Sequence, residues 1–330
     1  MTSPPGARVR ARLFDADHTD QRLEPDRAFE TTPSDRQLLW IDVTGELTSD
    51  VAARLAPLID LQPRTLRRLA QPTAMPHVAV HRDYLDVRIA VDPSGHDLTA
   101  ITWLDVIAGR NVVITHHERP VDFLDGVDAR IERDATAGSL SDAAFFTIVV
   151  DAAIASYLVA VDAIEEDVDR IDAVALRGVA NRDALGELVR CRRRIAGLRR
   201  LLADHRSVFT ALGSPEMGSV IESADEAAMV AGLASRFEGA LSAVEESREA
   251  LLGSFDVYMS QTAQRTNEVM KVLTVATVLL LPGSVIAGLL GMNVIVPLDK
   301  DNPASFWLVV GAIAVLAVAI VAIARARRWL

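Results

Sequence analysis

The sequence has few of the residues on which several kinds of site depend. Its 330 residues include one cysteine, Cys191, which excludes a disulfide framework and a cysteine-rich zinc site. Aromatic residues make up only 5% of the chain, and acidic residues outnumber basic ones, giving a formal net charge of −11. Proteins that bind nucleic acid need a basic surface, so this charge balance argues against a nucleic-acid partner.

Signals for nucleotide-driven or nucleophilic chemistry are also missing. The sequence has no G-x-x-x-x-G-K-[ST] phosphate loop and no nucleophile elbow. We therefore expect no bound nucleotide and no enzymatic activity. The histidine groups are His77 with His81, and His116-His117-Glu118, and neither has the pattern of a zinc site. We interpret them as structural or surface histidines.

Apolar residues are concentrated near the C-terminus. No charged residue occurs in 272–298 or in 303–324, and each run can cross a hydrocarbon core of about 30 Å as a helix. We predict two transmembrane helices, one ending at Leu290 and one over 304–324, with a short connection over 291–303. Basic residues flank the pair on one side, so the positive-inside rule places both termini in the cytoplasm.

The rest of the sequence predicts a cytoplasmic α/β domain followed by long helices. Strand-like runs alternate with short helical patterns, which indicates a mixed sheet flanked by helices. The apolar segment 143–161 is predicted to be a buried soluble helix, because Asp151 at its centre would be costly in a bilayer. The predicted strands are 8–14, 38–43, 78–81, 84–91, 98–107 and 111–115, and the short helices are 48–59, 63–69 and 121–133.

The long helices follow this domain. A helical hairpin is expected first, and then a stalk helix that opens near Pro215 and continues into the first transmembrane helix. The predicted divisions are 1–138 (α/β domain), 139–214 (helical hairpin), 215–290 (stalk and first transmembrane helix), 291–303 (outer loop), 304–324 (second transmembrane helix) and 325–330 (basic cytoplasmic tail).

The first transmembrane helix has one face that is smaller and more polar than the rest. Lipid does not favour such a stripe, so it should point at protein or at water. Two interpretations remain: a tight helix–helix contact, or a pore wall, which needs several copies of the chain because one hairpin cannot enclose a pore. The stripe consists of Asn267, Met270, Thr274, Thr277, Leu281, Ser284 and Gly288. Beyond it, the amide and carbonyl oxygens of Gly291-Met292-Asn293 suit hydrated Mg²⁺.

These features resemble the CorA family of divalent-cation channels. Gly-Met-Asn after a proline-containing span carries the resemblance, as do the segments 266–274, 40–43 and 111–116. The resemblance implies a CorA-like funnel with long stalk helices, built as a homopentamer in the inner (plasma) membrane. It also implies passive, potential-driven uptake of Mg²⁺, Co²⁺ or Ni²⁺. The partners that follow are further copies of the chain and the lipid bilayer.

The resemblance also assigns roles to single residues. Gly291-Met292-Asn293 would form the outer selectivity filter, and Met270, Leu273 and Leu281 would form a hydrophobic constriction that gates by dewetting. The implied pore-lining residues are Asn267, Met270, Leu273, Thr277, Leu281, Ser284 and Gly288. The family closes when cytoplasmic Mg²⁺ binds carboxylates between subunits. The candidates for this regulatory metal site are Glu165, Glu166, Asp169, Asp172 and Asp256.

The outer loop departs from the family pattern. It lacks the Met-Pro-Glu element that is common in the family, so Asp299 and Asp301 are expected to attract cations there. The sequence around Leu290 also resembles the zinc-transporting ZntB branch. A Zn²⁺ or broader divalent-cation transporter of the same architecture is therefore one alternative, and a membrane-anchored cytoplasmic sensor is another.

Overall fold

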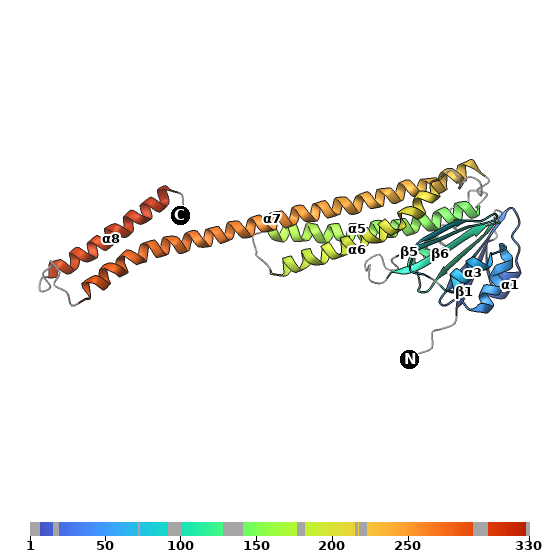
Figure 1. Ribbon diagram of the computed structural model, residues 1–330, viewed down its shortest axis with the longest axis horizontal. Helices are drawn as coiled ribbons and strands as arrows, with labels where there is room; N and C mark the ends of the chain where they lie inside the picture. The colour runs from blue at the N-terminus through green and yellow to red at the C-terminus, as the bar shows by residue number, and fades with distance from the viewer. Residues whose placement is uncertain are drawn as a thin grey trace, which may run out of the picture. The chain divides into compact units, whose positions relative to one another are not determined.

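The structure is a computed structural model of the chain. It describes residues 7–15, 20–71, 73–91, 101–127, 141–176, 182–214, 217, 223–292 and 303–327. Two compact units emerge, one formed by residues 1–173 and 181–254 and the other by 174–180 and 255–330. The architecture agrees with the predicted one: an α/β domain, long helices and a C-terminal pair of apolar helices (Figure 1).

The α/β domain contains a seven-stranded mixed sheet. The strand order is β2-β1-β3-β7-β6-β5-β4, and every neighbouring pair is antiparallel except β3 with β7. The strands are β1 (Arg8–Asp15), β2 (Gln21–Leu23), β3 (Gln37–Thr44), β4 (His77–Val80), β5 (Leu85–Val91), β6 (Thr102–Gly109) and β7 (Val112–His117). The predicted strands match β1 and β3–β7, apart from the start of 98–107, which lies outside the described residues.

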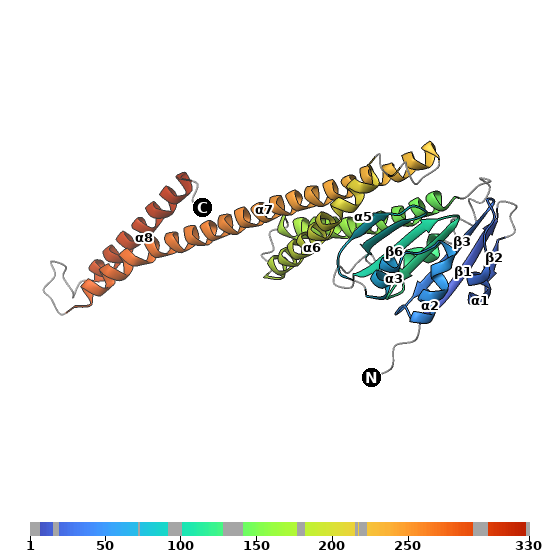
Figure 2. The same ribbon diagram turned by 45° about the vertical axis from the view of Figure 1, so that its right-hand side comes forward.

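Short helices cover one face of this sheet (Figure 2). They are α1 (Pro25–Glu30), α2 (Ser49–Leu55), η1 (Ala56–Leu58) and α3 (Pro63–Ala70). Thr48 caps α2 by accepting a hydrogen bond from the Val51 amide at 3.3 Å, and Pro63 opens α3 at a position where no amide donor is needed. Residues 122–127 are also helical, so this part of the predicted helix 121–133 is confirmed, starting one residue later. Residues 128–133 of that prediction lie outside the described residues.

A tight turn joins β6 to β7. Arg110 and Asn111 both have positive φ, at 52° and 59°, as a two-residue type I′ hairpin turn requires. Gly109 just before them has no room for a side chain, because a Cβ there would lie 2.2 Å from the Asp83 carbonyl oxygen. The turn therefore fixes the register of the β6–β7 pair at the centre of the sheet.

Two long helices, α5 (Asp142–Leu176) and α6 (Arg182–Leu212), belong to the same unit as the sheet. The Phe145 ring of α5 packs against Phe14 and Trp40, with ring centroids 5.8 and 5.3 Å apart. Half of the most apolar stretch of α5 is buried inside the protein. This burial agrees with the prediction that 143–161 belongs to the soluble part.

The same two helices close an open edge of the sheet. Strand β4 pairs with β5 only as far as Arg88, so the Ala90 backbone beyond it has no strand partner on that side. His205 of α6 accepts a hydrogen bond from the Ala90 amide at 2.8 Å, and Tyr157 of α5 donates one to the Ala90 carbonyl oxygen. His205 also donates to the Leu201 carbonyl oxygen at 2.7 Å, so its neutral form satisfies both contacts.

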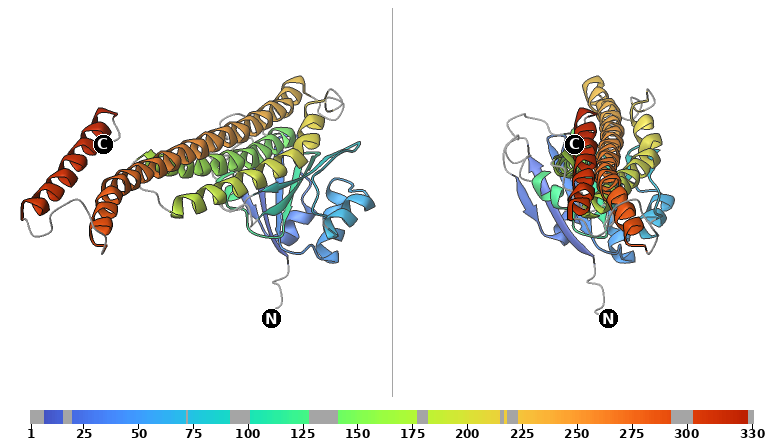
Figure 3. Two further views of the ribbon diagram at one scale, coloured as in Figure 1. Left: turned by 60° about the vertical axis from the view of Figure 1, so that its left-hand side comes forward. Right: turned by 90° about the vertical axis from the view of Figure 1, so that its left-hand side faces the viewer.

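The remaining long helices are α7 (Ala224–Leu290) and α8 (Pro303–Ala326). Figure 3 shows α7 as one unbroken helix, which continues past Pro282 although proline removes a backbone donor. It starts later than the expected position near Pro215. Its first half has a buried stripe of residues spaced three or four apart: Val230, Leu233, Phe237, Ala240, Val244, Ser247, Leu251 and Ser254.

Candidate functional site

The residues that sequence analysis assigned to a pore all lie on one face of α7 and are exposed in the single chain. For three apolar members, Met270, Leu273 and Leu281, the exposed fractions are 55%, 59% and 61%. The half-buried residues of the same stretch are Val275, Leu279, Pro282, Gly283, Ile286 and Leu290. At about 100° per residue, the centres of the two sets lie about 180° apart around the helix axis.

The half-buried face is the one that meets α8. A Cβ built on Gly283 would lie 3.5 Å from the Ile313 side chain, and Ala324 of α8 is only 7% exposed. Most of the polar stripe therefore points away from α8, and only Thr274, at the edge of the stripe, borders the groove between the two apolar helices. Both sequence-based interpretations stay open, because a tight helix–helix contact can also form with another copy of the chain. Contact with other copies of the chain, or with water, remains.

Hydroxyl groups on this stripe already use their protons. Thr274 donates to the Met270 carbonyl oxygen at 2.7 Å, Thr277 to Leu273 at 2.8 Å, and Ser284 to Leu280 at 2.9 Å. Each hydroxyl oxygen keeps its lone pairs, so the stripe presents hydrogen-bond acceptors to whatever lies beside it. Acceptors suit the water molecules around a cation, whose hydrogens point outward.

The end of α7 leads into the predicted selectivity filter. The Gly291 amide still donates to the Ala287 carbonyl oxygen at 3.0 Å, and the Met292 amide donates to Leu289 at 3.3 Å. A Cβ on Gly291 would lie 3.2 Å from the Ala287 oxygen, which favours glycine at this position. Met292 is 53% exposed. The other predicted residues of this region, Asn293, Asp299 and Asp301, lie outside the described residues.

The predicted regulatory carboxylates are dispersed in one chain. Glu165, Glu166 and Asp169 are exposed on α5, Asp172 is half-buried there, and Asp256 is exposed on α7. Among the described residues, no three histidine, cysteine, aspartate or glutamate side chains are close enough to hold a metal ion.

Nearby partners hold some of these acidic residues. Ser247 donates to Glu165 at 2.9 Å, and Asp167 in the same acidic run pairs with Arg194 of α6. The structure therefore does not bring the five candidates together within a single subunit.

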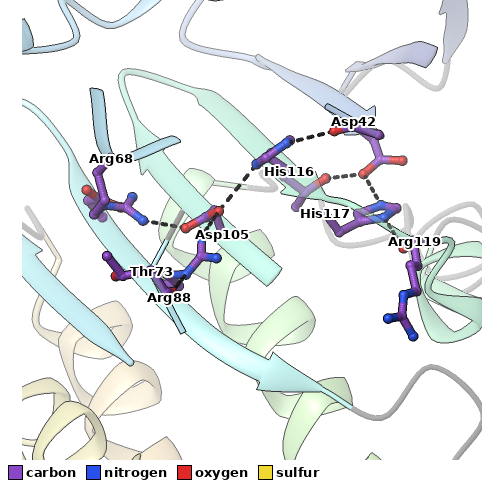
Figure 4. A network of polar contacts seen from close by, with 11 residues as sticks. Asp42, Arg68, Thr73, Arg88, Asp105, His116, His117 and Arg119 are labelled. Atoms are coloured by element: carbon purple, nitrogen blue, oxygen red, sulfur yellow. Dashed lines mark hydrogen bonds and ion pairs between the residues drawn. The ribbon is translucent and has the colours of Figure 1, made fainter. Parts of the chain in front are cut away.

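A buried network of charged groups lies in the sheet domain (Figure 4). Asp105 on β6 is 1% exposed and accepts from Arg88 at 2.6 Å, from Arg68 and from His116 at 3.3 Å. Burial alone would raise the pKa of Asp105. The hydrogen bond from His116 and the two guanidinium groups outweigh burial, and its pKa lies below the usual value.

The two histidines of this network have acceptors at both ring nitrogens. His116 contacts Asp105 and the Gly45 carbonyl oxygen at 3.0 Å, while His117 contacts Asp42 at 3.0 Å and the Arg119 carbonyl oxygen at 2.6 Å. Each ring nitrogen therefore has an oxygen within hydrogen-bonding distance. Both side chains are buried, which supports their interpretation as structural residues.

Sequence analysis missed the carboxylates and arginines of this network. Its only signal was the placement of charged residues two apart on β5, Asp86 and Arg88, which lie on one face of that strand. Both side chains are nearly fully buried. Burial raises the pKa of Asp86 to about 6, although Arg68 beside it acts in the opposite direction. Through the bonds from Arg68 to Asp86 and Asp105, these groups hold α3 on the sheet.

The fold and the stripe together define a class of protein. Two helices, α7 and α8, contain long apolar stretches of which nothing is buried within the chain. One of them continues from a soluble helical region and carries an exposed polar stripe of membrane-spanning length. An α/β domain continued by such helices is the architecture of an integral membrane protein.

Comparisons identify the family. Residues 35–325 match the family model described as "CorA-like Mg2+ transporter protein", so the chain belongs to the CorA family of divalent-cation transporters, which are not enzymes. The chain is 24% identical to the cobalt/magnesium transport protein CorA of Thermotoga maritima, over 96% of this chain and 93% of that protein.

Two solved structures share the fold. The CorA magnesium transporter of Methanocaldococcus jannaschii superposes with a TM-score of 0.75 at 19% identity, covering 98% of both chains. The full-length CmaX protein superposes with a TM-score of 0.70 at 22% identity, covering 97% of both chains.

Proposed function

We propose that this chain forms a homopentameric channel for passive, potential-driven uptake of hydrated Mg²⁺, with Co²⁺ and Ni²⁺ as further ions. The observation that carries the proposal is the exposed stripe of α7, whose hydroxyl groups at Thr277 and Ser284 lie opposite the α8 contact and present hydrogen-bond acceptors. It extends from Asn267 to Gly288, about 30 Å of helix, which matches the thickness of a hydrocarbon core. A single α7 cannot enclose a pore, so several copies must surround it.

The proposed pathway needs no fixed charge in its walls. The stripe contains no ionisable residue, so a hydrated ion meets hydroxyl and carbonyl oxygens and crosses apolar constrictions at Met270, Leu273 and Leu281. A membrane potential of 100 mV supplies about 4.6 kcal/mol to a divalent ion, twice the value for a single charge. This driving force is sufficient for uptake without nucleotide hydrolysis.

The proposed filter is Gly291-Met292-Asn293. Mg²⁺ gives up its water reluctantly, and neutral amide and carbonyl oxygens can hold the hydrated ion through that water and still release it. Asp299 and Asp301 would raise the cation concentration at the outer mouth. In this arrangement both termini lie in the cytoplasm and α7 and α8 are the two spans.

We further propose that cytoplasmic divalent cations close the channel. Glu165, Glu166, Asp169, Asp172 and Asp256 do not form a site in one chain, so a regulatory cation would bind where carboxylates of neighbouring copies meet. One buried oxygen of Asp172 has no hydrogen-bond partner among the described residues, which makes this carboxylate the most favourable candidate of the five.

The test is ion flux into proteoliposomes that contain a magnesium-sensitive dye. We expect Mg²⁺ entry that increases with an inside-negative potential and is lost in Asn293→Ala. Asn302→Ala, which changes another asparagine of the same connecting loop, is the matched control and should transport normally. An inserted Asn293→Ala protein that transports at the wild-type rate would falsify the assignment of the filter.

The same vesicles separate the alternatives. The resemblance around Leu290 to the zinc-transporting branch favours Zn²⁺ as the second candidate ion. Zinc entry that follows an imposed pH gradient, with little Mg²⁺ flux, would support that candidate. No flux of either ion from folded, inserted protein would support the membrane-anchored sensor, although an anchor has no need of the polar stripe.

A further inference from the structure

A groove of about 340 Å³ lies between α7 and α8. Its walls are aliphatic, with Val278 on α7 and Ile320 and Ile323 on α8. Only Thr274 and Arg327 are polar. The groove lies between the C-terminal end of α8 and the part of α7 that follows Lys271, away from the connection over 291–303. It is therefore at the depth where the acyl chains of one leaflet meet their headgroups.

The two polar residues of the groove, Thr274 and Arg327, differ in whether their hydrogen-bond donors are free to bind a ligand. The Thr274 hydroxyl proton is used, because it is donated to the Met270 carbonyl oxygen at 2.7 Å. The Arg327 side chain is exposed, and within the described part of the chain no acidic side chain pairs with it. Lys271, one helical turn before Thr274, is likewise exposed and unpaired among described residues. Arg327 therefore offers the groove a set of free hydrogen-bond donors with a positive charge.

An aliphatic groove with a cation at one end matches one class of membrane component. Val278 lies about 10 Å along the helix from Lys271. If Lys271 is level with the lipid headgroups, Val278 is level with the part of an acyl chain nearest its headgroup. Basic sites between transmembrane helices bind anionic headgroups, and a guanidinium pairs with phosphate through two parallel hydrogen bonds. We propose that this groove binds one acyl chain of an anionic phospholipid and that Arg327 binds its phosphate, with Lys271 adding charge.

This inference rests on insertion of the α7–α8 pair in a membrane and not on which ion the protein transports. The acidic residue closest along α7 is Glu268, one turn before Lys271, and it makes no ion pair with either cation. Two free basic groups favour an anionic lipid over a zwitterionic one. Each is expected to strengthen binding about fivefold.

Lipid binding to the full-length protein tests the proposal without any transport measurement. Delipidated protein in detergent would be titrated with phosphatidylglycerol or with phosphatidylcholine of the same acyl chains, and native mass spectrometry would count bound lipids per chain. We expect phosphatidylglycerol to bind about 25-fold more tightly, about fivefold from each of the two basic groups. Arg327→Gln should remove most of this difference, and the matched control Arg325→Gln, on the same helix end but outside the groove, should keep it.

A second pair of variants tests the groove itself. Val278→Trp should fill it and weaken binding of both lipids severalfold. Val285→Trp, on the same helix outside the groove, should bind lipid like the wild type. Val278 and Val285 are both exposed in the chain, at 47% and 52%, so neither change is expected to disrupt packing.

Three results would overturn the proposal. Equal weakening by Arg325→Gln and Arg327→Gln would indicate general surface charge, and unchanged binding in Val278→Trp would indicate a site elsewhere. Disulfide-linked dimers of Val278→Cys in vesicles would show that a second copy occupies the groove. Cys191, the single native cysteine, is buried and would not interfere. If the wild-type protein binds the lipid as expected but shows no Mg²⁺ flux, the proposed function is contradicted and the lipid site is not.

Discussion

The sheet domain and the C-terminal helix pair place their side chains in opposite ways. In the sheet, ionic side chains such as Arg88 and Asp105 are 2% and 1% exposed, and each is paired. In the helix pair, large apolar side chains such as Leu280 and Trp307 are 64% and 70% exposed. The sheet domain pairs these buried ionic side chains within one chain, although both ring nitrogens of the buried His81 lack a hydrogen-bond partner among the described residues. The helix pair leaves its apolar side chains exposed in the single chain, and in the proposed function lipid and other copies of the chain cover them.

The largest expected effect is on the sheet domain. Asp105→Ala leaves Arg68, Arg88 and His116 without the carboxylate that pairs with them, and we expect a loss of about 3–5 kcal/mol in the free energy of unfolding. Urea unfolding of the full-length protein in detergent, followed by tryptophan fluorescence, measures this loss, because Trp40 is buried in this domain.

The control for that change is an exposed ion pair of the same domain. Asp26 pairs with Arg54 at 2.6 Å, but its side chain is 86% exposed. Asp26→Ala should cost less than about 1 kcal/mol. If the two aspartate changes cost the same, the buried network does not stabilise the domain in the way described above.

The next effect concerns the two exposed faces of the helix pair. Gly288 on the stripe and Gly311 on α8 both face open space in one chain, with no atom within 4 Å of an added Cβ. Gly288→Leu should lower Mg²⁺ flux tenfold or more, because several copies would each bring a leucine into the pathway. Gly311→Leu, on a lipid-exposed helix, should leave the flux within about twofold of the wild type in the proteoliposome assay. Equal fluxes for the two variants would contradict a pore at the stripe.

The smallest expected effect is a pH dependence of the sheet domain. The pKa of Asp86 is raised from 3.8 to about 6, so the folded state binds this proton more tightly than the unfolded state does. The resulting stabilisation is fully present below pH 3.8 and is lost as the pH rises through about 6. On acidification from pH 7 to pH 5, the wild type should gain about 1 kcal/mol relative to Asp86→Asn. Urea midpoints that differ between the wild type and Asp86→Asn by the same amount at pH 7 and pH 5 would contradict this prediction.

Most of the sheet could be predicted from the sequence because its strands alternate apolar residues or consist of β-branched runs. Strand β2 and helix α1 were missed. They have three and six residues, too few to show a period, and contacts with the rest of the domain hold them. The start of α5 and the end of α6 lie close to the bounds of the predicted helical hairpin, 139–214, because Ser141 is a good helix N-cap and Gly213 breaks the helical pattern. Ser141 does cap α5, accepting from the Ala144 amide at 3.1 Å.

The stripe on α7 could also be predicted, because helical spacing places its residues on one face whatever surrounds the helix. The direction in which that face points could not be predicted, because it depends on where α8 packs against α7. The buried network was hidden for another reason. Charged residues in a strand ordinarily mark a solvent face, and only the arginines of α3 and β5 reveal that Asp86 and Asp105 are covered and paired.

The closed edge at Ala90 has a consequence for synthesis. Strand β5 is made early, but its two edge partners, Tyr157 and His205, are made later in the chain. At ordinary translation speeds, roughly ten seconds separate the completion of β5 from the synthesis of His205. During that interval the nascent sheet carries an open strand edge that another nascent chain could join. Final protection of the α/β domain against aggregation on the ribosome thus depends on helix residues encoded 67 and 115 positions downstream of Ala90 at its sheet edge.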